Sequence, residues 1–207
     1  MIKKIINEIN KTLSLNDNIK KIKKTGFINQ NISILIHYRN SFKGHFGHAD
    51  ICINDKVYSY GNYDEYNNCL FEAIGDGMLL IADKKQYIKF CQEYGKTIVV
   101  INIPFKAKEI ECIYNNIINL KNNIIKFTKT IKKDSYLYLL KQKVTVQTYK
   151  FNNDYKTYFF IHKNCVNFII NILNLKYLNN YKIKSPGIIL LESMKDINNN
   201  IFICQKY

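Results

Sequence analysis

Apolar and polar residues alternate along several short stretches of the chain, as they do in half-buried strands. This pattern predicts strands over residues 31–38, 48–53, 57–60 and 144–151, and a short apolar run after Gly75-Asp76-Gly77 predicts a further strand over 78–81. The stretch 97–103 is β-branched and almost wholly apolar, which predicts a central strand. Turn-forming residues lie between two of the strands, at Asn54, Asp55 and Lys56, so we expect a hairpin there.

Helical spacing of apolar residues appears in the other parts of the chain. The predicted helices cover residues 1–25, 84–94, 106–128, 164–175 and a segment that begins at Ser185. Asp83 is a suitable N-cap and Gly95 a suitable end for the second of these helices. Because hairpins and helices occur without regular βαβ units, we expect an α+β fold.

The order of these elements indicates how the chain is divided. Without a linker rich in Gly, Pro or Ser, we expect a basic helical segment over 1–25 followed by one domain over 26–207. The sequence contains no apolar run near the roughly 18 residues of a membrane-spanning helix. Its first residues also lack the apolar stretch of a secretory signal. We therefore expect a soluble protein that is cytoplasmic at synthesis.

The chain carries 31 Lys and Arg residues against 16 Asp and Glu residues, which gives a net charge of +15. Arg39 is its single arginine. Proteins that read base edges depend on the planar guanidinium group, which lysine does not reproduce. We therefore expect no sequence-specific nucleic-acid partner, and instead attraction to an anionic polymer or to a membrane surface.

Cys165 has the sequence context of an activated nucleophile. The chain has six cysteines without a Cys-x-x-Cys pair, so we expect reduced thiols. Asn164 is a good N-cap and places Cys165 in the first turn of the predicted helix, where the helix dipole favours thiolate over thiol. On a helical wheel Cys165 lies beside Phe168, Ile169 and Ile172, so its side chain faces inward.

His48 is the candidate base for this cysteine. It opens the strand 48–53 after a loop with several glycines, and it shares one face of that strand with Asp50 and Cys52. A third polar group on the neighbouring strand would orient the imidazole. Ser59 lies on the side of His48 if the turn uses two residues, and Tyr60 does so if it uses three. Zinc binding by His45, His48 and Cys52 is a rival interpretation.

At these two segments the sequence resembles the circularly permuted papain-like hydrolases, which include relatives of the NlpC cell-wall peptidases and the lecithin:retinol acyltransferase-like proteins. In that superfamily the histidine comes first, on a strand after a glycine, and the cysteine comes later, at the start of a buried helix. The corresponding residues here are Gly47-His48-Ala49-Asp50-Ile51 and Asn164-Cys165-Val166-Asn167-Phe168. Further similarity, at residues 57–61, 75–77 and 185–187, is to a bacterial branch whose members occur among type VI secretion effectors.

The resemblance implies a permuted papain-like fold, in which an antiparallel sheet packs on a buried helix that carries the cysteine. It implies a cysteine amidase or peptidase in which Cys165 attacks a carbonyl, His48 moves the proton, and no metal or organic cofactor is needed. Many relatives carry a second histidine or an amide at the orienting position, where this chain offers Ser59 or Tyr60.

The most favoured substrate is an amide bond in bacterial cell-wall peptide. One alternative is a lipase or acyltransferase of the same fold that acts on phospholipid esters at an anionic membrane. Another is a basic binding protein in which Cys165 is merely packed. As a toxin of the effector class, the protein would be exported by a specialised secretion system and would have an immunity protein as a partner.

Overall fold

The computed structural model describes residues 32–39, 47–67, 74–159, 161, 163–176, 178, 184–189, 192–193 and 203–206. The predicted helix over 1–25 lies outside the described residues, and so does most of the loop before His48. The described helical turn over 186–189 begins directly after Ser185, as the Ser-Pro pair predicts.

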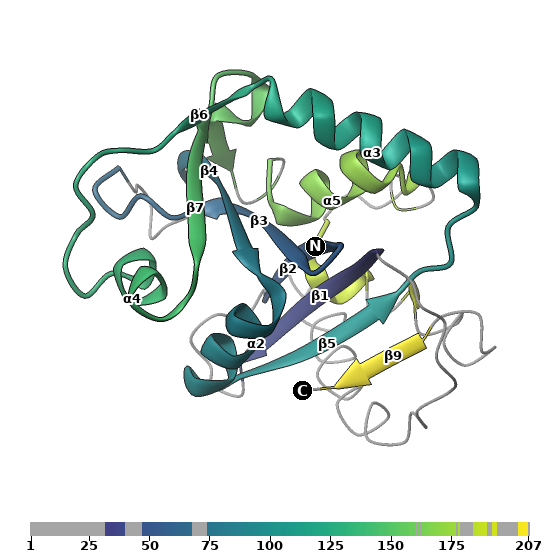
Figure 1. Cartoon of the computed structure of the whole chain (residues 1–207), viewed down its shortest axis with the longest axis horizontal. Coiled ribbons are helices and arrows are strands. Elements are labelled where there is room, and N and C mark those ends of the chain that lie inside the picture. Colours follow the sequence, from purple (N-terminus) through teal and green to yellow (C-terminus); the bar gives the residue numbers. More distant parts are fainter. Residues whose placement is uncertain are drawn as a thin grey trace.

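One antiparallel sheet forms the centre of the molecule (Figure 1), with the strand order β6-β7-β4-β3-β2-β1-β5-β9 and with β8 paired to β4. The strands are β1 (Ile32–Arg39), β2 (His48–Ile53), β3 (Lys56–Asn62), β4 (Ile74–Asp83), β5 (Lys96–Asn102), β6 (Ile124–Lys126), β7 (Val146–Phe151), β8 (Thr157–Phe159) and β9 (Ile203–Lys206). The α+β prediction is thereby confirmed at the level of a mixed fold with an antiparallel sheet.

The β2–β3 hairpin turns through two residues. Asn54 and Asp55 both have positive φ, 48° and 61°, as a type I′ turn requires, and Ile53 pairs with Lys56. Asn and Asp tolerate this conformation better than most residues. The turn sets the register of β3 and puts Ser59 on the same sheet face as Asp50 and Cys52.

The helices are α2 (Lys84–Glu93), α3 (Ala107–Lys121), α4 (Tyr136–Lys143) and α5 (Cys165–Leu173), with a 3₁₀ turn η1 over Asp154–Lys156. Asp83 caps α2 through its side chain, as predicted. The prediction of a continuous helix over 106–128 is wrong beyond Lys121, because Ile124–Lys126 forms β6 and pairs with β7. This tertiary pairing overrides a helical spacing of apolar residues that the sequence continues to residue 127.

The sheet has a hydrophobic core on each face. On one face α5 packs against β2 and β3, with α3 against α5, and on the other α2 and α4 cover the sheet (Figure 1). Ile51 and Phe168 belong to the first core, and Leu35 and Tyr87 belong to the second. Among the helices that the structure describes, none is long and apolar enough to cross a lipid bilayer.

The packing of Phe168 in the first core gives a stability prediction. Phe168 is 1% exposed and stacks on Tyr60 with 5.2 Å between ring centroids. We expect Phe168→Ala to lower the free energy of unfolding by about 3–5 kcal/mol, because it leaves a cavity. The matched control is Ile118→Ala, since Ile118 is 56% exposed and its loss should change stability by about 0.5 kcal/mol or less. Equal effects in urea unfolding would contradict this account of the core.

Candidate active site

The start of α5 holds Cys165 in a fixed position. The Oδ1 atom of Asn164 accepts hydrogen bonds from the backbone N–H groups of Val166 and Asn167, each at 3.0 Å, which confirms the predicted N-cap. Its Nδ2 atom donates to the carbonyl of Lys184 at 2.8 Å. The Cys165 side chain is buried against the sheet. The cap therefore fixes the sulfur at the positive end of the helix.

His48 opens β2 directly after a glycine that the backbone requires. Gly47 has φ +65°, and a Cβ atom there would lie 2.8 Å from the carbonyl oxygen of His37 on β1. Because any larger residue would be strained and would crowd β1, glycine sets the entry of the chain into β2. The side chain of His48 is 22% exposed, so it lies at the border between core and solvent.

Three side chains surround the Nε2 atom of His48. The Oγ of Ser59 is 2.9 Å away with hydrogen-bond geometry, and the hydroxyl of Tyr63 is 3.1 Å away. The Oδ1 of Asp50 lies 2.8 Å from the same nitrogen as an ion-pair contact. His48 also forms a side-chain hydrogen bond to Cys165 and interacts with its charge. Since Nε2 is occupied, Nδ1 is the ring nitrogen that is available to the sulfur.

Asp50 is a fully buried carboxylate at the centre of this cluster, with an exposed fraction of 0%. Its Oδ2 accepts a hydrogen bond from Nε2 of His37 at 2.6 Å and another from the hydroxyl of Tyr87 at 3.0 Å. Burial alone would raise the pKa of Asp50, but the charge of His48 and the hydrogen bond from His37 hold that pKa well below its usual value. Asp50 is therefore an anion inside the core.

The pKa values of the two histidines shift in opposite directions, although Asp50 favours the charged form of both. Burial alone would lower the pKa of His48, but the charges of Asp50 and Cys165 and its hydrogen bonds to them raise it to about 10. For His37, burial lowers the pKa and outweighs the attraction of Asp50, with Lys96 and His48 adding to the decrease. His48 is thus an imidazolium at neutral pH, and His37 is a neutral imidazole. An imidazolium beside a sulfur favours the thiolate.

The register of the hairpin decides between the two predicted orienting residues. Ser59 lies beside His48 and also hydrogen-bonds to Tyr63. Tyr60 points to the other face of the sheet, where its hydroxyl donates to the carbonyls of Tyr155 at 3.1 Å and Thr157 at 3.3 Å. Tyr60 keeps an electrostatic interaction with Cys165, which together with burial raises its pKa.

Sequence reasoning missed Asp50 and Tyr63 as partners of the imidazole. For Asp50 a signal was present, because residues two apart on a strand share a face and His48 and Asp50 are such a pair. Tyr63 lies after the end of β3, in a loop whose path the local pattern does not determine.

Of the residues in the zinc interpretation, His45 lies outside the described residues and Cys52 is buried beside Ser33. In the described part of the chain, no cluster of metal-ligating side chains is present.

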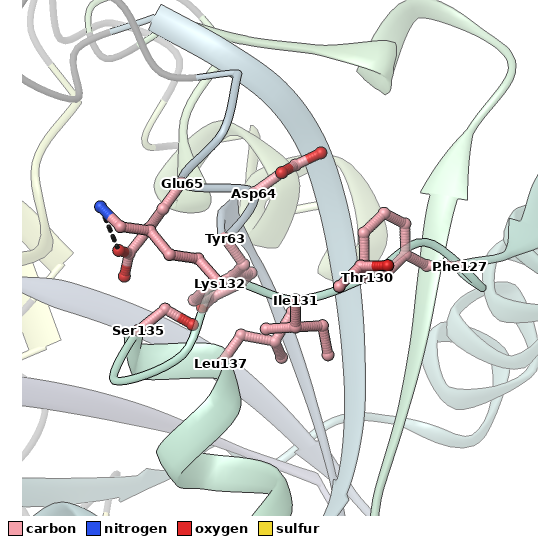
Figure 2. Close-up of a pocket in the computed structure, with 9 residues that line it drawn as sticks. All are labelled: Tyr63, Asp64, Glu65, Phe127, Thr130, Ile131, Lys132, Ser135 and Leu137. Atoms are coloured by element: carbon pink, nitrogen blue, oxygen red, sulfur yellow. Dashed lines mark ion pairs between the residues drawn. The ribbon is translucent and has the colours of Figure 1, made fainter.

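The loop that carries Tyr63 is held in place by contacts with the segment before α4. Figure 2 shows Tyr63, Asp64 and Glu65 beside the segment that leads into α4, with Glu65 facing Lys132. The Oε1 atom of Glu65 accepts a hydrogen bond from the backbone N–H of Tyr136 at 3.0 Å. The pocket between them has about 10 Å³, which is room for roughly one water molecule. This pocket therefore supports Tyr63 and is too small for a substrate.

A larger, open groove is lined in part by the same loop. It has about 500 Å³ and is lined mostly by polar side chains, namely Asp64, Tyr66, Asn67, Thr128, Lys129 and Thr130. Asp64 is held in place by Lys150 at 2.9 Å and by Asn67 at 3.0 Å. Asp64 follows Tyr63 in the chain, but Tyr63, His48 and Cys165 are not among the residues that line this groove.

Comparison with known proteins finds no match to this chain among family models, curated proteins or solved structures.

The charge state of His48 is open to direct measurement. Since its folded-state pKa is raised, the imidazolium contributes stability fully below about pH 6.5, and this contribution is lost as pH rises through about 10. We expect the ¹⁵N resonances of His48 to titrate near pH 10. In Asp50→Asn we expect them to titrate well below that value, because burial lowers the pKa of His48 and the negative charge that opposes this effect is gone. Titration of wild-type His48 near pH 6.5 would contradict the ion pair.

Proposed function

We propose that the protein is a cysteine hydrolase with a permuted papain-like arrangement, in which Cys165 is the nucleophile and His48 is the acid and base. The observation that carries this proposal is the imidazole of His48, which lies between the sulfur of Cys165 and the buried carboxylate of Asp50. A sulfur at a helix N-terminus with an imidazole in contact is the arrangement that nucleophilic catalysis needs. Asp50, Ser59 and Tyr63 act as positioning residues for the imidazole.

The reaction follows from these positions. The Cys165 thiolate attacks the substrate carbonyl carbon, a C–S bond forms, and the carbonyl electrons move onto its oxygen. Nδ1–H of His48 then protonates the leaving amine as the C–N bond breaks, which yields an acyl-enzyme. Next, neutral His48 takes a proton from water and the resulting hydroxide adds to the thioester carbon. The C–S bond then breaks, which re-forms the thiolate beside the imidazolium and releases the carboxylic acid, whose proton goes to solvent.

The oxyanion that forms during attack needs hydrogen-bond donors. In the first turn of α5, the side chain of Asn164 already accepts the N–H groups of Val166 and Asn167. The backbone N–H of Cys165 is therefore the first-turn donor that we assign to the oxyanion. Its position on the nucleophile itself places it close to the attacked carbonyl.

The open polar groove that begins at Asp64, the residue after Tyr63 in the chain, supports a peptide amide as the substrate. Its carboxylate, amide, hydroxyl and ammonium groups can pair with the polar backbone of a peptide. The net charge of +15 adds attraction to anionic polymers such as cell wall. We therefore propose that the protein cleaves an amide bond in bacterial cell-wall peptide.

One feature next to the nucleophile favours a phospholipid ester as the second candidate. Ile161 is 46% exposed at the tip of a turn that reciprocal backbone hydrogen bonds between Phe159 and Lys163 close, just before Cys165. Lys156 and Lys163 flank this turn and are exposed. An exposed apolar tip between lysines suits an anionic membrane surface.

The proposed nucleophile predicts an unusual alkylation profile. At pH 6 we expect iodoacetamide to modify Cys165 about tenfold or more faster than the half-buried Cys112, because the His48 imidazolium favours the thiolate. His48→Gln should remove this difference, and peptide mapping by mass spectrometry measures both sites in one sample. If Cys165 reacts no faster than Cys112, or if His48→Gln leaves its rate unchanged, the activated nucleophile is excluded.

The two candidate substrates are separated by a paired assay. We expect the protein to release new amine termini from purified peptidoglycan, and we expect Cys165→Ser to lower that rate by about three orders of magnitude or more. Anionic liposomes are incubated in parallel and assayed for free fatty acid. Fatty-acid release without new amine termini would overturn the amide proposal in favour of the ester.

A further inference from the structure

The described residues contain a second histidine that the proposed mechanism does not use. His37 lies on β1 and pairs with His48 across the strands, with 5.6 Å between the ring centroids. Its side chain is 2% exposed. A histidine in an apolar strand is usually explained by packing, and the sequence alone gives no other role for it.

The hydrogen bonds of His37 define its tautomer. An ionised carboxylate only accepts hydrogen bonds, so the 2.6 Å contact requires Nε2 of His37 to carry the proton that it donates to Oδ2 of Asp50. Its Nδ1 atom is buried and has no hydrogen-bond partner among the described residues. A proton on Nδ1 would therefore be a buried charge without an acceptor, which keeps His37 neutral.

The two oxygens of Asp50 have different partners. Oδ2 is held by His37 and Tyr87, and Oδ1 faces Nε2 of His48 at 2.8 Å. The donors on Oδ2 come from two elements outside β2, namely β1 and α2. They therefore fix the rotation of the carboxylate from outside the strand that carries both Asp50 and His48.

We propose that His37 is a positioning residue for catalysis, which acts through Asp50 to keep His48 an imidazolium. The link to catalysis rests on the proposed function, whereas the effect of His37 on the protonation state of His48 does not. Without the donor on β1, the buried carboxylate either rotates toward Tyr87 or takes up a proton. In both cases the negative charge near Nε2 of His48 decreases, and the imidazolium loses its stabilisation.

Other titratable groups also face this cluster. His37 faces Asp50 and His48 on β2, Tyr87 on α2 and Lys96 on β5. Asp50 acts in addition on Tyr63, on Cys91 of α2 and on Tyr136 of α4, and burial together with its charge raises the pKa of each. The tyrosine hydroxyls and the Cys91 thiol stay neutral through the physiological range, and Lys96 keeps its positive charge, so the pairs of Asp50 with the two histidines dominate the titration.

The test compares His37→Gln, which retains an N–H donor at the end of its side chain, with His37→Leu, which does not. The first readout is the ¹⁵N titration of His48 in the full chain, and the second is the rate of Cys165 alkylation between pH 5 and 11, which includes the pKa of His48. In His37→Leu we expect the pKa of His48 to fall by at least about one unit. At pH values above about 10, the fraction of His48 that is protonated, and so can pair with the thiolate, is then about tenfold lower than in the wild type. His37→Gln should largely restore both readouts.

A folded His37→Leu protein with an unchanged titration and alkylation profile would overturn the proposal, as would equal losses in both variants. If His37→Leu does not fold, the wild-type protein supplies the test. Its ¹⁵N shifts must show His37 as the neutral Nε2–H tautomer, and any other protonation state contradicts the proposal. Because neither readout needs a substrate, failure of the hydrolase assay leaves this result separate and interpretable.

Discussion

The burial of the Asp50 carboxylate is the constraint on which the rest of the site depends. An ionised carboxylate in a core is costly unless charges and hydrogen-bond donors compensate it. Here the compensation comes from His37, His48 and Tyr87, on three elements of the fold. The same compensation makes His48 a cation at the edge of the core, where the capped start of α5 brings Cys165. The sheet register therefore determines both the stability of the carboxylate and the state of the imidazole.

The residues that hold the imidazole of His48 and the sulfur of Cys165 come from opposite faces of the sheet. On one face of the sheet, α2 and α4 cover Asp50 and its partners, and on the other α5 brings in the sulfur at its N-terminus. His48 connects the two because it begins its strand at the border with solvent. The buried contacts of Asp50 thus lie behind the imidazole, on the side away from solvent.

Local signals predicted the parts of the site that local interactions determine. The Asn164 cap and the inward face of Cys165 follow from a few consecutive residues, and the structure confirms both. The choice between Ser59 and Tyr60 depended on the turn length, which a run of turn-forming residues left open. Asp50 and His37 could not be paired from the sequence, because their contact depends on the β1–β2 register. The predicted end of the helix that corresponds to α3 was wrong for a similar reason, because residues 124–126 pair with β7 and form the strand β6.

The central claim is that Cys165, paired with His48, accepts an acyl group from a carbonyl substrate. Acid quenching of the full chain during its reaction with a chromogenic acyl ester, followed by peptide mass mapping, measures this step directly. The account predicts a burst of chromophore and an acyl group on the peptide that contains Cys165, with neither in a variant that lacks the thiol at that position. Turnover of the ester with no acyl group on Cys165, or with the label on another cysteine, would contradict it.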